Sequence, residues 1–102
     1  MRQEVVSRAT DSIYEFMTNA SVLQVSSPVV VEVEFDEFKL EVDLDYEGLP
    51  MHLPETPPSV DALGAGEGAV TLLSGYIIRQ YADRLKVTSR NGHCHIHLHF
   101  EH

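Results

Sequence analysis

The stretch VVVEVEFDEFKLEVDL, residues 29–44, decides the fold class because apolar and polar side chains alternate along it with a period of two. Valine, phenylalanine and leucine at alternate positions are separated mostly by glutamate, lysine and aspartate. This alternation is typical of half-buried β-strands, and Asp36-Glu37 between the two runs forms a short hairpin link. The pattern predicts strands over 29–35 and 38–44 with one apolar face, which helices cover, and one polar face.

Helical patterns lie on both sides of this hairpin. Apolar residues recur at steps of three and four from Gln3 to Ala20, and again from Glu67 to about Asp83, as in amphipathic helices. A second strand pair follows at about 85–89 and 93–100, and the intervening Asn-Gly is a strong hairpin signal. The order predicts an α+β two-layer sandwich, with two helices on one face of a four-stranded sheet.

The apolar positions of each element define the expected core. On the helices the predicted buried stripes are Val6, Ala9, Ile13, Phe16, Met17 and Ala20, then Val70, Leu73, Ile77 and Tyr81. The expected core residues are Phe16, Val31, Val33, Leu40, Val42, Leu73, Ile77, Ile96 and Leu98. Residues 46–66 hold four prolines and three glycines with little periodicity, so they predict a lid-like loop, the most mobile internal segment.

Composition excludes several classes of function. The 102 residues are enough for one domain, and seven Lys and Arg against sixteen Asp and Glu leave a formal net charge of -9. That charge disfavours nucleic acids and anionic lipid surfaces as partners. No apolar run approaches the roughly 20 residues of a membrane span, so we expect no direct membrane insertion. The single cysteine, Cys94, fits a reducing cytosol and is expected to be a buried hydrophobe rather than a nucleophile.

Three features, in the right order, resemble the ATP-binding fold shared by histidine kinases, type II topoisomerases and heat-shock chaperones. An E-x-x-x-N motif lies on the first helix, an aspartate with a nearby glycine ends the second strand, and glycines cluster where the lid meets the second helix. The resemblance implies binding of ATP with magnesium, with phosphate held by backbone amides at the helix start. The residues that would form this site are Glu15, Asn19, Asp45, Gly48, Gly64, Gly66 and Gly68.

Departures from that family pattern are as clear as the matches. Glu47 replaces the first glycine of the family's D-x-G-x-G, and Gly48 is displaced by one position. Glu67 places a negative charge in the would-be phosphate loop, and residues 46–66 contain no lysine or arginine. We therefore interpret the motifs as eroded and expect neither a cofactor nor an enzyme. A working ATP-binding domain, histidine-kinase-like or anti-sigma-factor-like, is the alternative.

A second resemblance extends from residue 35 to residue 102, in the segments 35–50, 54–59, 67–84 and 95–102. FDEFKLEVDLDYEGLP, EGAVTLLSGYIIRQYADR and HIHLHFEH resemble the soluble C-terminal domain of bacterial xanthine/uracil permeases, the nucleobase–cation symporter family. The resemblance implies a non-catalytic regulatory or interaction domain, a piece of a larger membrane protein on the cytoplasmic side of the inner membrane. Its partner would be the transmembrane permease domain of the same chain, with a second copy of the chain, in a homo-oligomer, as a further candidate partner.

The last strand carries an unusual set of histidines. His93, His95, His97 and His99 alternate with Cys94, Ile96, Leu98 and Phe100, so strand geometry places all four imidazoles on one face, about 6.6 Å apart. Alternate histidines on a strand can clamp zinc, copper or nickel. The other interpretation is a solvent-facing surface beside Lys39, Glu41 and Asp43, on which metal binding is weak and adventitious.

Overall fold

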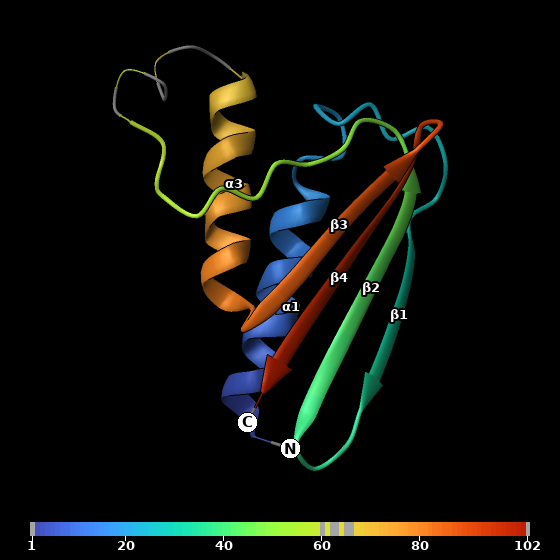
Figure 1. The fold of residues 1–102 in the computed structure, drawn as a ribbon, viewed down its shortest axis with the longest axis vertical. Helices are drawn as coiled ribbons and strands as arrows, with labels where there is room; N and C mark the ends of the chain where they lie inside the picture. Colours follow the sequence, from blue (N-terminus) through green and yellow to red (C-terminus); the bar gives the residue numbers. More distant parts are fainter. Residues whose placement is uncertain (1, 60, 62–63, 65–66, 102) are drawn as a thin grey trace.

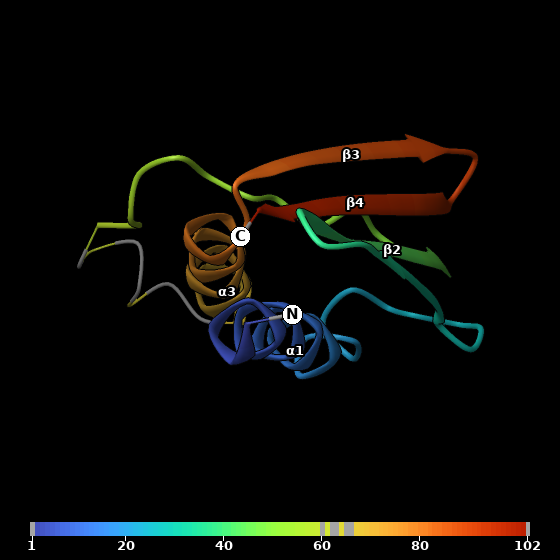
Figure 2. The same cartoon turned by 90° about the horizontal axis from the view of Figure 1, so that it is seen from below.

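The computed structural model describes residues 2–59, 61, 64 and 67–101. Its elements are α1 (Gln3–Met17), β1 (Val30–Phe35), β2 (Lys39–Glu47), α3 (Glu67–Tyr81), β3 (Arg84–Arg90) and β4 (His93–Glu101). The strands form one antiparallel sheet in the order β1-β2-β4-β3, and both helices lie on the same side of it (Figures 1 and 2). The predicted two-layer α+β sandwich is confirmed.

The two central strands, β2 and β4, supply most of the core. Val42 pairs with Leu98 and Leu44 with Ile96, and all four side chains are at most 1% exposed. Period-two alternation places their neighbours on the opposite face, away from the helices. The buried apolar side chains of the two strands are Leu40, Val42, Leu44, Tyr46, Cys94, Ile96, Leu98 and Phe100.

Helix α1 packs on this sheet through a stripe that begins one residue earlier than predicted. Val5 and Ala9 are buried, whereas the predicted Val6 and Met17 are 36% and 45% exposed. The remaining buried positions of the helix are Ser12 and Phe16. The Ser12 hydroxyl donates a hydrogen bond to the Arg8 carbonyl, at 2.8 Å, so a polar residue is tolerated at a core-facing position.

Helix α3 buries a different face from the predicted one. Val70 is 56% exposed, and Leu73 and Ile77 are only half-buried. The buried face consists of Ala69, Thr71, Ser74, Gly75 and Ile78. Small residues line this face because segment 48–59 crosses the helix closely (Figure 1). The predicted stripe was chosen from large apolar residues, whereas small and polar residues form the buried face. The predicted stripe is therefore wrong.

Strand β1 is the largest departure from the predicted core. Val31 pairs with Leu44 and Val33 with Val42, so the predicted register is confirmed and these valines lie on the apolar side of the sheet. They are nevertheless 40% and 48% exposed, and the core assignment of both is wrong. Strand β1 lies at the sheet edge, whereas α1 packs over β2 and β4. Phe38, expected at the start of a strand, lies in the hairpin turn and is 72% exposed.

The predicted lid begins as a strand and continues as a segment, residues 48–59, that packs across α3 and is called the strap below. Strand β2 runs to Glu47, two residues into the predicted loop. Beyond it Met51 and Leu53 are buried, and the Leu53 carbonyl accepts a hydrogen bond from Arg79 Nε of α3 at 2.6 Å. Positions 60, 62, 63, 65 and 66 of the predicted lid lie outside the described residues. The expected mobility of this segment stays a prediction, which hydrogen exchange can measure.

Candidate functional site

The residues of the predicted nucleotide site are divided between the two faces of the sheet. Asn19 follows α1 and is 3% exposed, and its side-chain Nδ2 donates to the Glu15 carbonyl at 2.8 Å. The side-chain amide thus hydrogen-bonds a backbone carbonyl in the last turn of the helix instead of facing a ligand. Asp45 points from β2 to the side opposite the helices, where it lies beside histidines of β4. The sheet therefore separates Asp45 from the E-x-x-x-N pair.

The glycines of the predicted nucleotide site do not bridge Asp45 and the Glu15–Asn19 pair. A Cβ at Gly48 would come within 2.6 Å of the Leu23 carbonyl oxygen, so close backbone packing explains this glycine. Gly68 is exposed at the start of α3 with open space around it, and Gly64 is also exposed. Gly66 lies outside the described residues. The described residues of the motif thus lie in separate places and do not line one common site.

The face of the sheet away from the helices carries a different cluster, which we call the histidine–carboxylate ladder. Register places acidic residues of β2 directly opposite histidines of β4, and opposed residues share a face. Its members are Glu41, Asp43, Asp45, His93, His95, His97 and His99. The closest atom pairs are His93 Nε2–Asp45 Oδ1 at 3.3 Å, His95 Nε2–Asp43 Oδ1 at 2.7 Å, His97 Nδ1–Asp43 Oδ1 at 2.8 Å and His99 Nδ1–Glu41 Oε1 at 3.1 Å.

These contacts favour ionised carboxylates. The hydrogen bond from His99 is the main cause that lowers the pKa of Glu41. Burial acts to raise the pKa of Asp43, but hydrogen bonds from His97 and His95 outweigh it, and the pKa is lowered. On the opposite face, burial raises the pKa of Tyr46, whose phenol donates to the Leu49 carbonyl at 2.7 Å. Glu41 and Asp43 are therefore held in the ionised form beside the imidazoles.

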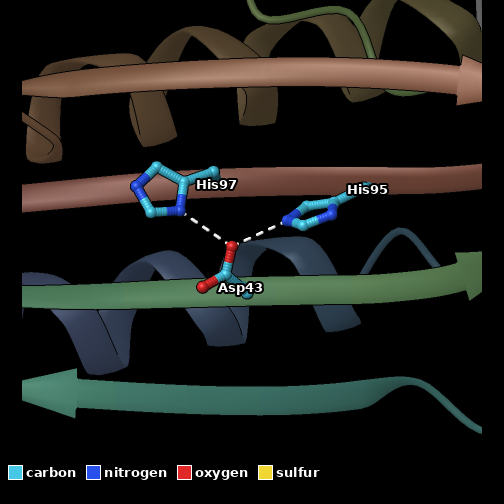
Figure 3. Close-up of side chains that lie close together, drawn as sticks. All are labelled: Asp43, His95 and His97. Atoms are coloured by element: carbon cyan, nitrogen blue, oxygen red, sulfur yellow. Dashed lines mark hydrogen bonds and ion pairs between the residues drawn. The ribbon is translucent and has the colours of Figure 1, made fainter.

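Three members of the ladder converge on one point (Figure 3). Asp43 presents a single oxygen to both His95 and His97, and the potential ligand atoms of the three residues lie within 4.8 Å of one another. They line a hollow of about 200 Å³ together with Lys86 and Thr88 of β3. Each of the three side chains is partly exposed, so solvent and ions reach them.

Of the four histidines predicted as ligands, the structure brings only two into this trio. His93 lies beside Asp45, and His99 is held between Glu41 and Glu101, at 3.1 and 3.2 Å. Asp43 is a candidate ligand that the alternation of histidines along β4 does not predict. Its position on a polar strand face was visible in the sequence, but pairing of β2 with β4 is a long-range contact that local patterns do not reveal.

Comparison of the chain with protein-family models, curated proteins and solved structures finds no match. In the described part of the chain, neither α1 nor α3 is both long and apolar enough to cross a membrane.

Proposed function

We propose that this chain is a non-catalytic interaction domain that binds an extended, basic segment of a partner along the free edge of β1. One observation carries the proposal: all six residues of β1 are exposed, although the strand alternates apolar and acidic side chains as a half-buried strand does. An uncovered apolar strand at a sheet edge is a ready template for another strand. Proteins that bind peptides by strand addition use such an edge.

The two faces of β1 define the chemistry of the partner. Val31, Val33 and Phe35 lie on the helix side of the sheet, and Glu32 and Glu34 lie on the other side. A strand added at this edge places its own alternate residues beside these two rows. The complementary segment therefore alternates apolar residues with lysine or arginine.

Charge disfavours pairing of β1 with β1 of a second copy of the chain. The formal net charge is -9, so two copies repel each other at long range. Pairing β1 with β1 would also bring Glu32 and Glu34 of each copy onto the same face, and like charges placed opposite one another are destabilising. A basic strand is instead attracted to the acidic chain at long range, and it places positive charges beside Glu32 and Glu34.

The resemblance to permease C-terminal domains supplies a source for this partner. Cytoplasmic loops of membrane proteins carry an excess of lysine and arginine. In this proposal the domain regulates a xanthine/uracil permease by docking on a cytoplasmic segment of the transmembrane part of the same chain, at the inner membrane. If the coding sequence upstream of Met1 encodes no apolar spans, the permease part of the proposal fails.

The docking edge is tested by NMR titration of the 15N-labelled domain with two synthetic peptides of equal length, one alternating valine with lysine and one alternating valine with glutamate. The lysine peptide is expected to bind and to shift the amide signals of residues 30–35. A Val31→Ser/Val33→Ser variant should bind at least tenfold more weakly, because it loses the apolar row.

The matched control is Val6→Ser/Val70→Ser, which removes two valines of similar exposure from α1 and α3. This variant should bind the lysine peptide like the unmodified domain. Equal binding of both peptides, shifts confined to the histidine face, or equal losses in both variants would contradict docking on β1.

A further inference from the structure

We propose that Asp43, His95 and His97 form a binding site for one divalent transition-metal ion, for which zinc serves as the probe. The site lies on the face of the sheet opposite to the helices, away from the apolar row of β1. It is thus independent of the proposed docking function.

The ligand atoms are already gathered around one point. Asp43 Oδ1 lies 2.7 Å from His95 Nε2 and 2.8 Å from His97 Nδ1 (Figure 3). Without an ion, one oxygen is shared by two imidazole nitrogens. Zinc binds imidazole nitrogen and carboxylate oxygen at about 2.0–2.2 Å. An ion that replaces the protons between Asp43 Oδ1 and the two imidazole nitrogens would therefore be bound by the same three atoms.

The other nitrogen of each ring also has a carboxylate beside it. His95 Nδ1 lies 3.4 Å from Asp45 Oδ1, and His97 Nε2 lies 3.8 Å from Glu41 Oε1. A metal-binding imidazole carries its proton on the nitrogen away from the ion, and a carboxylate that accepts this proton orients the ring and strengthens its bond to the metal. At 3.4 and 3.8 Å neither contact is a hydrogen bond, but each carboxylate lies beside the nitrogen that would carry the proton and attracts it electrostatically.

The strands hold the ligands in place. Asp43 and His97 are paired directly across β2 and β4, and His95 is the next residue on the same face of β4. These strands are anchored by the fully buried Val42 and Leu98 on their other side. Ligands on central strands lose little freedom when they bind an ion.

The surroundings leave room for a further ligand. The hollow of about 200 Å³ over the trio is open to solvent, so water can complete a four-coordinate ion. Glu41 and Asp45 add negative charge beside the trio, whereas Lys86, which also lines the hollow, opposes the ion. Two imidazoles with one carboxylate select zinc, cobalt or nickel over magnesium and calcium, which prefer oxygen ligands alone.

The test uses the 102-residue chain without a purification tag, freed of metal by chelation and titrated with zinc chloride in a calorimeter. We expect one ion per chain, with a dissociation constant in the micromolar range. His95→Gln/His97→Gln and Asp43→Asn should each weaken binding at least tenfold. The control is His52→Gln, which removes an exposed histidine outside the ladder and should change the affinity less than threefold.

A third variant tests the role of the outer carboxylates. Asp45→Asn leaves all three proposed ligands in place and should weaken zinc binding about tenfold, because it removes the negative charge that lies 3.4 Å from His95 Nδ1. NMR signals of the His95 and His97 rings should shift on zinc addition, whereas those of His52 should not. The proposal is overturned if the control loses as much affinity as the ligand variant. It is also overturned if zinc leaves the two rings unshifted or binds without a defined stoichiometry.

Discussion

Replacing Gly75 by alanine is expected to destabilise the domain by about 3 kcal/mol, since overpacked sites that cannot relax lie at the upper end of such costs. Gly75 lies on the buried face of α3 where the strap from β2 crosses the helix. A Cβ at this position would overlap the backbone carbonyl of His52 and lie 3.3 Å from Leu53 Cα. Because both neighbours are backbone atoms, no side-chain rotation relieves the overlap. Either the strap or the helix must move.

The free energy of unfolding, measured in urea, tests this expectation. The matched control is Gly68→Ala on the same helix, where an added Cβ meets nothing within 4 Å. Alanine is favoured over glycine in a helix by up to about 1 kcal/mol, so the control should be unchanged or slightly more stable. A Gly75→Ala variant as stable as Gly68→Ala would show that the strap does not lie against α3 as described.

Truncation of Phe16 should have an effect of the same order. Its side chain is 0% exposed and its ring centroid lies 5.0 Å from that of Tyr46, so it joins α1 to the sheet. Phe-to-Ala changes in cores cost roughly 3–5 kcal/mol because transfer energy is lost and a cavity remains. For a domain of this size, that is a large part of the total stability.

Tyr14 provides the control for Phe16. It lies on the same helix, is also aromatic, and is 68% exposed. Tyr14→Ala should change the free energy of unfolding by no more than about 0.5 kcal/mol. If Tyr14→Ala and Phe16→Ala destabilise equally, then α1 does not pack on the sheet through the stripe that contains Phe16.

The strands and their register are the part of the fold that the sequence predicts best. Period-two alternation determines which face each residue occupies, and it places Val31 on the same side as Leu44. Alternation says nothing about which strand becomes an edge. For that reason Val31 and Val33 are correctly oriented yet uncovered. The buried face of α3 is hidden from the sequence for another reason: close packing selects small residues such as Ser74 and Gly75, which a hydrophobicity pattern overlooks.

The candidate metal site shows the same division between local and long-range information. Alternation along β4 predicts that the histidines share a face, and this is what the structure has. The third ligand depends on which strand lies beside β4. Asp43 is 54 residues from His97 in the chain, and their contact forms only because β2 rather than β1 borders β4. Sequence separation of this size is beyond any local pattern.

The position of Cys94 gives the domain an internal reporter. It is the only cysteine of the chain, is 0% exposed on a central strand, and its thiol donates to the Gly48 carbonyl at 3.4 Å. A thiol reagent in solution can reach this sulfur only when the core around it opens. The rate of its modification in native buffer therefore measures how often the core beside β4 opens, as hydrogen exchange does for backbone amides. Opening of the core can thus be followed without introducing a cysteine by mutation.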